Sequence, residues 1–241
     1  MKLAIIPARG GSKRIPRKNL KPFCGQPIMA WSIAAALQSS CFDEVMVSTD
    51  DEEIAALARR CGASTPFVRP AALADDYAGT AAVMRHAVAW YDEQGRRPEA
   101  ACCIYATAPF IRAQDLRQGL AILQQQQSHY AFTVTSYPFP IQRSLRITAR
   151  GRVEMLQPAH MHTRSQDLEE AFHDAGQFYW GTAEAWLDSQ PIYGPDSVPL
   201  LLPRHRVQDI DTPEDWRRAE LMFQALQAQP SDDTPLTGPT V

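Results

Sequence analysis

Six cationic side chains and two adjacent glycines occupy the segment IIPARGGSKRIPRKNLK, which runs from Ile5 to Lys21. No acidic residue precedes Asp43, although the formal net charge of the chain is -3. Glycine turns expose backbone N–H groups, and clustered guanidinium and ammonium groups neutralise phosphate oxygens. Gly10 and Gly11 are predicted to adopt positive φ and to let the backbone approach a ligand closely. The segment is therefore predicted to bind a polyphosphate.

A solvated charged loop is the alternative interpretation of this basic segment. Pro16 fixes its own φ and keeps Ile15 extended, which favours a stiff binding site over a mobile tail. The segment has neither the GxxxxGK[ST] pattern of a Walker A loop nor the GxGxxG pattern of a dinucleotide site. The candidate phosphate ligands by residue type are Arg9, Ser12, Lys13 and Lys18.

A pair of aspartates near the other end of the chain, in RVQDIDTPEDW, is the second candidate site. Asp209 and Asp211 lie two positions apart, so both carboxylates face one side of an extended segment and can share a magnesium ion. Solvated or helix-capping acids are the usual explanation of such a pair, and Asp211 or Thr212 can cap a helix that begins at Pro213. The combination with a polyphosphate loop is what favours a metal site.

The elements that must position these residues alternate between strand and helix. The helix in STDDEEIAALARRCG is predicted with Thr49 or Asp50 as its cap and arginines in its last turn. Strands are predicted at residues 3–6, 44–48, 67–68, 101–106 and 130–136, and further helices at about 27–39, 80–93 and 114–127. This alternation predicts an α/β fold with a doubly wound, mostly parallel sheet and helices on both faces. The loops starting at Pro7, Ser48, Arg69 and Ala106 then lie on one rim, where ligands bind in such folds.

One domain is predicted over residues 1–229, and it includes an arm at about 137–171. Prolines, isolated arginines and two short extended pieces around Gly151 indicate a hairpin that leaves the main sheet. The core is expected to resume with a strand at 177–180, a helix near 182–187, a strand at 198–202 and a helix at 213–227. The polar segment 230–241 is predicted to be disordered.

Bulk composition excludes several classes of protein. The pI near 6.1 argues against a general polyanion binder. The five cysteines form no CxxC pair, which favours free thiols in a reducing cytoplasm. No run of 18 apolar residues and no signal-peptide core is present, so a cytoplasmic protein is expected.

Five motifs, in order along the chain, carry a resemblance to a known family. They are IPARGGSKRIPRKN, FDEVMVSTDDEEIA, RPAALADD, ATAP and QDIDTPEDW. Together they resemble the CMP-sialic acid synthetase family, the cytidylyltransferases that activate nine-carbon keto sugar acids. The motifs YATAPF, YPFPIQRSL and HDAGQFYWG are most similar to the pseudaminic acid cytidylyltransferase branch of that family.

The resemblance implies a nucleotide-diphospho-sugar transferase (Rossmann-like) fold with a dimerisation arm, a homodimer that exchanges the arm, and magnesium dependence. It implies that CTP and the sugar acid give CMP-sugar and pyrophosphate, with Asp209 and Asp211 as metal ligands and Arg9, Lys18 and Asp211 as catalytic residues. The implied nucleotide-binding residues are Ala8, Arg9, Gly10, Gly11, Ser12, Lys18, Asn19, Ser48 and Arg69. The implied sugar-binding residues are Tyr105, Thr107, Arg143, Arg164, His173, Asp174 and Gln177.

Two departures from the sialic acid pattern fall where the sugar is expected. Tyr105 begins YATAP where a sialic acid enzyme has QPTSP, and His173 and Asp174 replace an arginine and an asparagine near those positions. These changes argue against N-acetylneuraminate and favour a differently decorated nonulosonate. The resemblance to the branch implies pseudaminic acid, used for bacterial surface glycans or flagellin, with N-acylneuraminate or legionaminate as the alternatives. A DxD glycosyltransferase and a non-catalytic nucleotide-binding protein are the alternatives of another class.

Overall fold

A computed structural model describes residues 1–75 and 78–228 of the chain. Six strands form the central sheet in the order β10-β6-β9-β5-β1-β4. β9 is antiparallel to both of its neighbours, and the other pairs are parallel. The strands are β1 (Lys2–Pro7), β4 (Glu44–Ser48), β5 (Ala100–Ile104), β6 (Tyr130–Ser136), β9 (Phe172–Thr182) and β10 (Ser197–Leu201). The predicted α/β fold with a mostly parallel sheet is confirmed.

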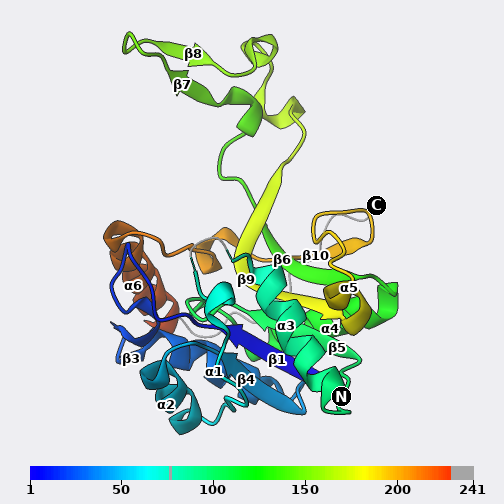
Figure 1. The fold of residues 1–241 in the computed structure, drawn as a ribbon. Helices are drawn as coiled ribbons and strands as arrows, with labels where there is room; N and C mark the ends of the chain where they lie inside the picture. Colours follow the sequence, from blue (N-terminus) through cyan, green and yellow to red (C-terminus); the bar gives the residue numbers. More distant parts are fainter. Residues whose placement is uncertain (76–77, 229–241) are drawn as a thin grey trace.

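Helices cover both faces of this sheet (Figure 1). They are α1 (Ile28–Ser39), α2 (Glu52–Arg60), α3 (Thr80–Glu93), α4 (Ala113–Gln126), α5 (Ala183–Leu187) and α6 (Pro213–Ala228). The small strands β2 (Pro22–Phe23) and β3 (Gln26–Pro27) pair with each other beside α1. No helix in the described ranges is long and apolar enough to cross a bilayer.

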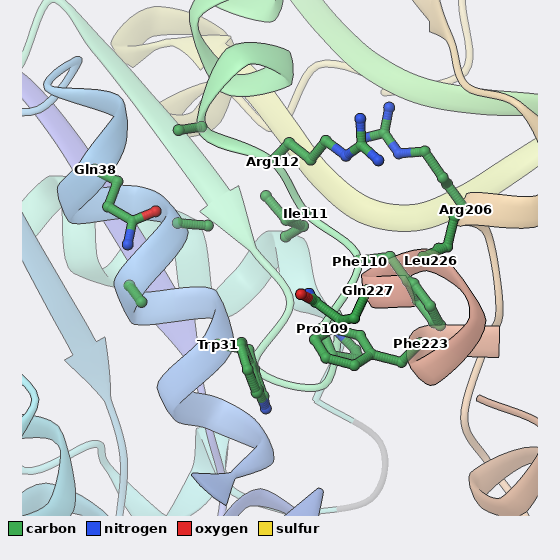
Figure 2. A pocket seen from close by; sticks show the side chains of 13 residues that line it. Trp31, Gln38, Pro109, Phe110, Ile111, Arg112, Arg206, Phe223, Leu226 and Gln227 are labelled. Carbon is green, nitrogen blue, oxygen red and sulfur yellow. The ribbon is translucent and has the colours of Figure 1, made fainter. Parts of the chain in front are cut away.

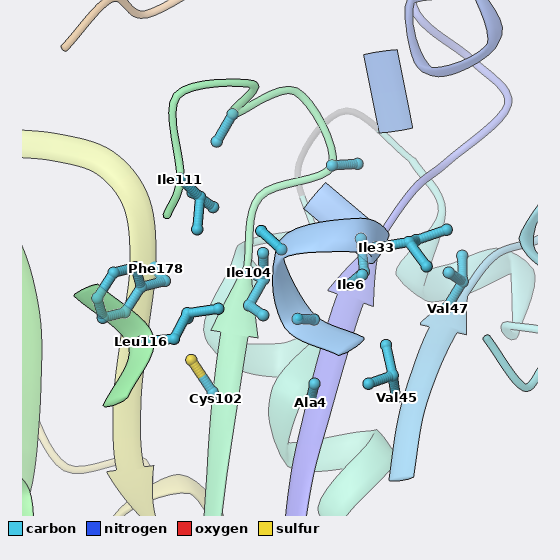
Figure 3. Packing of buried hydrophobic residues seen from close by; sticks show 14 of the residues in the cluster. Ala4, Ile6, Ile33, Val45, Val47, Cys102, Ile104, Ile111, Leu116 and Phe178 are labelled. Carbon is cyan, nitrogen blue, oxygen red and sulfur yellow. The ribbon is translucent and has the colours of Figure 1, made fainter. Parts of the chain in front are cut away.

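Two buried clusters lie on opposite faces of the sheet because successive strand residues point to opposite sides. On one face, Ile6, Val47 and Ile104 pack with Ile33 of α1 and Leu116 of α4 (Figure 3). The other face carries a matching cluster from alternate strand positions and from α3 and α5: Leu3, Ile5, Met46, Met84, Val88 and Trp186.

A third buried cluster joins segments that are far apart in the sequence. Ile15 of the basic loop and Ile210, between the two aspartates, are 3% and 1% exposed and belong to one apolar group with Phe110, Trp216 and Phe223. Burial of these side chains brings the basic loop, the loop after β5 and the start of α6 together. The same packing therefore brings the two candidate sites together.

An arm leaves the sheet between β6 and β9 and carries the hairpin of β7 (Leu145–Ile147) and β8 (Val153–Met155). Figure 1 shows the hairpin projecting away from the body of the molecule. Large apolar side chains of the arm are exposed, among them Ile147 at 80% and Val153 at 63%.

Two expectations about the elements are wrong. Residues 67–68 form no strand, and the next residue, Arg69, donates its backbone N–H to the Thr49 carbonyl at 2.8 Å. The cap of α2 is Asp51, whose carboxylate accepts the backbone N–H of Ile54 at 3.0 Å, and neither Thr49 nor Asp50 has that role. The predicted disordered segment 230–241 lies outside the described residues.

Candidate active site

The basic loop begins where β1 ends against β4. Pro7 is paired with Ser48, and the N–H of Ala8 donates to the Ser48 carbonyl at 2.9 Å. Asn19 is 7% exposed, and its side-chain amide donates to the carbonyl of Arg9 at 2.9 Å. The loop is therefore closed on itself and anchored on the carboxyl ends of two parallel strands, where ligands bind in such sheets.

The glycines of this loop do not have the predicted backbone conformation. Neither Gly10 nor Gly11 has positive φ. A Cβ at Gly10 would lie 2.8 Å from the Asp51 carboxylate, so glycine is required there by the close approach of the residue that caps α2. The Gly10 N–H donates to Asp50 at 3.0 Å, whereas a Cβ at Gly11 would meet open space.

Two cations of the loop reach the aspartate pair. The Arg14 guanidinium lies 2.8 Å from the Asp211 carboxylate, and the Lys18 ammonium lies 3.5 Å from the same oxygen. Lys18 also donates to the Ile210 carbonyl at 2.6 Å. The basic loop and the aspartate pair therefore meet in the structure, as a shared site for metal and polyphosphate requires. Arg14 was not among the predicted site residues.

The other loop cations contact other parts of the protein. Arg17 pairs with Asp51 and Glu53 at the start of α2, and Lys21 lies 4.4 Å from the ring centre of Trp216. Arg9 donates to the Asp75 carbonyl at 2.5 Å, which directs its guanidinium toward the segment after Arg69. Ser12 is half-buried in the turn between these cations.

The aspartate pair fits a magnesium ion that is also bound by phosphates. Partial loss of solvation, together with the negative charge of Asp211, raises the pKa of Asp209, so a cation beside the pair would relieve a repulsion. No cluster of three or more acidic, histidine or cysteine ligands exists within residues 1–75 and 78–228. Mg²⁺ is commonly held by one or two carboxylates, with substrate phosphates and water completing the shell.

Ser48 and Arg69, the predicted nucleoside contacts, are hydrogen-bonded to each other at the carboxyl end of β4. The Arg69 side chain donates to the Ser48 hydroxyl at 3.1 Å and also to its carbonyl, and both residues are buried. Burial lowers the pKa of the Arg69 guanidinium to about 10, so the group remains charged at neutral pH. A buried positive charge at this position attracts an anionic ligand.

A cavity of about 520 Å³ opens between β5, β6, β9 and the aspartate segment. Tyr105, His173 and Asp174, all predicted to contact the sugar, line it together with Asp209. Asp211 is not among its lining residues and faces the basic loop. The cavity therefore adjoins the pair on the side of Asp209.

Asp174 is the centre of a hydrogen-bond network in this cavity. Its carboxylate accepts the Tyr193 hydroxyl at 2.8 Å, the Gly176 N–H at 2.8 Å and, at shorter range, the Tyr179 hydroxyl. All three donors are groups of this chain, and they fix the Asp174 carboxylate in the wall of the cavity. Tyr193, on the loop before β10, was not predicted from the sequence because nothing in its local pattern marks it.

The remaining predicted sugar contacts lie elsewhere. Gln177 is 2% exposed and donates to the Arg206 carbonyl at 2.7 Å. Thr107 is half-buried in the loop after β5. Arg143 and Arg164 are exposed on the arm, where Arg143 donates to Ser165 at 3.2 Å and Arg164 pairs with Asp167 at 2.6 Å. Neither arginine is among the residues that line the cavity, and the arm that carries them projects away from the body of the molecule (Figure 1).

A strand-to-helix loop rich in cations, two carboxylates across the rim and an adjoining cavity define a nucleotidyltransferase-like site. Among solved structures, CMP:2-keto-3-deoxy-manno-octonic acid synthetase complexed with CTP has the same fold, with a TM-score of 0.67 and 16% identity, covering 93% of this chain and 99% of that one. The family model described as cytidylyltransferase matches residues 3–194. The chain belongs to the cytidylyltransferase family.

Curated relatives extend over nearly the whole chain. The pseudaminic acid cytidylyltransferase of Campylobacter jejuni is 46% identical over 221 residues, which cover 92% of this chain and 95% of that protein. The CMP-N,N'-diacetyllegionaminic acid synthase of Legionella pneumophila is 31% identical and covers 93% and 97%. Identity is therefore markedly higher to the enzyme named for pseudaminic acid.

Proposed function

We propose that this protein transfers CMP from CTP to pseudaminic acid and releases pyrophosphate. The 46% identity to the Campylobacter enzyme over 92% of the chain is the observation that supports this substrate. The identity to the legionaminic acid enzyme is lower, at 31%. The departures at Tyr105, His173 and Asp174, which line the cavity, agree with a sugar other than N-acetylneuraminate.

In the proposed reaction, the anomeric C2 hydroxyl of the sugar attacks the α-phosphorus of CTP. The new bond joins the C2 oxygen to phosphorus, and the bond from phosphorus to the bridging oxygen breaks. Pyrophosphate leaves with the electron pair of that bond, and the hydroxyl proton passes to water. Arg9 and Lys18 neutralise charge on the phosphate oxygens, and Ser12 and the backbone from Ala8 to Gly11 position them. Ser48, Arg69 and Asn19 position the nucleoside and the loop.

Asp209 and Asp211 are the residues that we propose hold Mg²⁺. When bound, the ion supplies positive charge to the triphosphate and lowers the pKa of a hydroxyl that contacts it. Asp211 has a second proposed catalytic role, because its contact with Lys18 fixes that cation beside the phosphates. Asp209 faces the cavity in which we place the sugar.

We also propose a cytoplasmic homodimer that exchanges its arm, residues 137–171. The exposed apolar side chains of the hairpin support this proposal, because the hairpin projects away from the body of the same chain. Exchange would bring Arg143 and Arg164 of each chain to the sugar carboxylate in the other chain's cavity, through two-point guanidinium contacts. The five free cysteines fit a reducing compartment.

The experiment that tests the substrate compares three sugar acids with CTP and magnesium. Pseudaminic, N,N'-diacetyllegionaminic and N-acetylneuraminic acids are supplied separately, pyrophosphate release is measured, and the product is identified by mass spectrometry. We expect the largest kcat/KM with pseudaminic acid. A larger value with another acid would change the proposed substrate, and no release with any acid would leave a non-catalytic nucleotide-binding protein.

A further inference from the structure

A buried ion pair lies close to the aspartate pair in the sequence but outside the predicted site. Arg206 ends the 3-10 turn Arg204–Arg206, three positions before Asp209. Its guanidinium donates to the carboxylate of Asp115 in the first turn of α4, and both side chains are 9% exposed. Figure 2 shows the Arg206 side chain extending from its segment toward Arg112, the residue at the start of α4.

The same turn is held from a second direction. The side-chain amide of Gln177 in β9 donates to the Arg206 carbonyl at 2.7 Å, and Gln177 is 2% exposed. The side chain of Arg206 is therefore fixed to α4 while its backbone is fixed to the central sheet. We call Asp115, Arg206 and Gln177 the buried clamp.

The buried clamp is difficult to explain by stability alone. Replacing a buried ion pair by apolar groups of similar volume is often neutral or stabilising. Two further atoms, Arg206 Nε and Gln177 Oε1, are buried without a hydrogen-bond partner in the described part of the chain. Unpartnered buried polar groups cost free energy. A requirement for fixed geometry at this turn accounts for these costs.

The geometry that the clamp fixes is that of the segment from Val207 to Thr212. This segment belongs to no strand or helix, so it has no ladder of backbone hydrogen bonds to hold it. At its far end Lys18 donates to the Ile210 carbonyl, and the N–H of Asp211 donates to Asp215 at 3.1 Å. The clamp holds the near end.

We propose that Asp115, Arg206 and Gln177 are positioning residues for the metal-binding aspartate pair. The inference rests on the proposed function, because it takes Asp209 and Asp211 as the magnesium ligands. Substitution of residues that orient metal ligands without contacting the metal commonly lowers metal affinity 10- to 100-fold. Substitutions in the clamp are expected to lower the metal affinity and to change the turnover rate at saturating metal only slightly.

The test measures metal binding directly as well as activity. Mn²⁺ is titrated against the full-length protein, with the free ion followed by electron paramagnetic resonance, and the half-activating Mg²⁺ concentration is measured at saturating CTP. Arg206→Lys keeps the charge but loses the planar fork. We expect it to weaken Mn²⁺ binding and to raise the half-activating Mg²⁺ concentration by about tenfold. Unchanged Mn²⁺ affinity in folded Arg206→Lys would overturn the proposal.

Two further variants keep the test decisive if Arg206→Lys does not fold. The double variant Asp115→Leu/Arg206→Met replaces the pair by apolar groups and is expected to fold. Gln177→Met removes the separate bond to the Arg206 carbonyl. Weaker Mn²⁺ binding in these variants would support the positioning role of the clamp. Folded variants that bind Mn²⁺ with the affinity of the parent protein would contradict that role.

Matched controls separate this inference from the proposed function. Arg96→Lys alters another arginine–carboxylate pair, Arg96 with Glu44 at 2.9 Å, and is expected to leave Mn²⁺ binding unchanged. An equal loss of affinity in Arg96→Lys would show a general effect and overturn the clamp. Asp209→Asn is expected to abolish the binding. If Asp209→Asn still bound Mn²⁺, the proposed metal site itself would be refuted. If Asp209→Asn lost Mn²⁺ binding and the clamp variants bound Mn²⁺ as the parent does, only the role of the clamp would be refuted.

Discussion

At the scale of single residues, Lys18 is a loop cation whose ammonium group has two fixed contacts. It contacts the Asp211 carboxylate at 3.5 Å and the Ile210 carbonyl at 2.6 Å, so its ammonium group is held where the loop meets the aspartate pair. Such a preorganised charge stabilises a transition state without having to reorganise during the reaction.

Lys18→Met is expected to lower kcat/KM for CTP by about 10²- to 10³-fold, as loss of a single oxyanion donor does. Pyrophosphate release with varied CTP measures the effect. Lys21→Met is the control, because Lys21 lies over the Trp216 ring and outside the site. If both variants lost activity equally, general loop charge would explain the result and the specific role of Lys18 would be wrong.

Asp174 determines the shape of the cavity wall through its three donors, Tyr179, Tyr193 and the Gly176 N–H. In Asp174→Asn, the amide nitrogen cannot accept a tyrosine hydroxyl, and an unpaired buried donor costs about 1–3 kcal/mol. We expect the KM for the sugar acid to rise by about tenfold while the KM for CTP stays within twofold. Tyr193→Phe should show a smaller change in the same direction. An equal rise in both KM values would contradict a local role at the sugar.

At the scale of elements, α2 is joined to the basic loop through its cap. The Asp51 carboxylate accepts the Ile54 N–H and pairs with Arg17, and it is the group that a Cβ at Gly10 would strike. The hydrogen bond from Arg17 is the main cause that lowers the pKa of Asp51 below its usual value.

Asp51→Ala is expected to lower the free energy of unfolding at pH 7 by about 1 kcal/mol, the typical value of an N-cap. Because the folded-state pKa is depressed, this stabilisation is complete above the usual aspartate pKa, about 4, and is lost as the pH falls through the lower folded value. Urea unfolding at pH 7 and at successively lower pH measures how the free energies of unfolding of the variant and the parent converge. Glu53→Ala, which also loses a contact to Arg17 but caps nothing, is the control. A difference that persisted undiminished in acid would contradict the linkage to Asp51.

Elements with strong local signals were predictable from the sequence. The predicted bounds of β4, α3 and β6 agree with the structure, because each has a continuous apolar run or a clear helical period. β9 was predicted as residues 177–180 but extends from Phe172 to Thr182. His173, Asp174 and Gly176 break its apolar pattern where its pairing with β6 changes register. The chain enters β9 from the arm. The local sequence pattern of β9 does not indicate that the strand runs antiparallel to its neighbours.

The candidate site was predictable where residue type alone indicates chemistry. The loop cations and the aspartate pair could be recognised because phosphate and magnesium require those types. Arg206 and Asp115 could not be assigned, and Gln177 was predicted as a sugar contact, since the contacts of these residues join β9, α4 and the 3-10 turn across the fold. The role of Gly10 was also missed, because it follows from the approach of α2 and involves no positive φ.

At the scale of the whole molecule, the proposed site is divided between a body and an arm. The loop cations, the aspartate pair and the cavity belong to the body, whereas Arg143 and Arg164 are exposed on the arm. Figure 1 shows that the arm extends away from the body of its own chain. Exposed apolar surface of this kind is typical of an interface, and a symmetric pair of chains can bury it on both arms at once.

Ile147→Glu places a charge in the proposed interface, because Ile147 is 80% exposed on the hairpin, and is expected to give a monomer in light scattering coupled to gel filtration. Leu221→Glu on α6, where the side chain is 61% exposed, is the control and should leave the dimer intact.

Complementation then tests whether the arm acts on the partner's site. Arg164→Ala leaves the body complete, and Asp209→Asn leaves the arm complete, so each variant alone should be nearly inactive. After the two are unfolded and refolded together, half of the dimers are mixed and each has one complete site, which predicts about a quarter of the parental activity. Recovery requires Arg164 to reach the other chain's cavity. A refolded mixture that contained mixed dimers but remained inactive would show that each arm acts on its own chain or on neither.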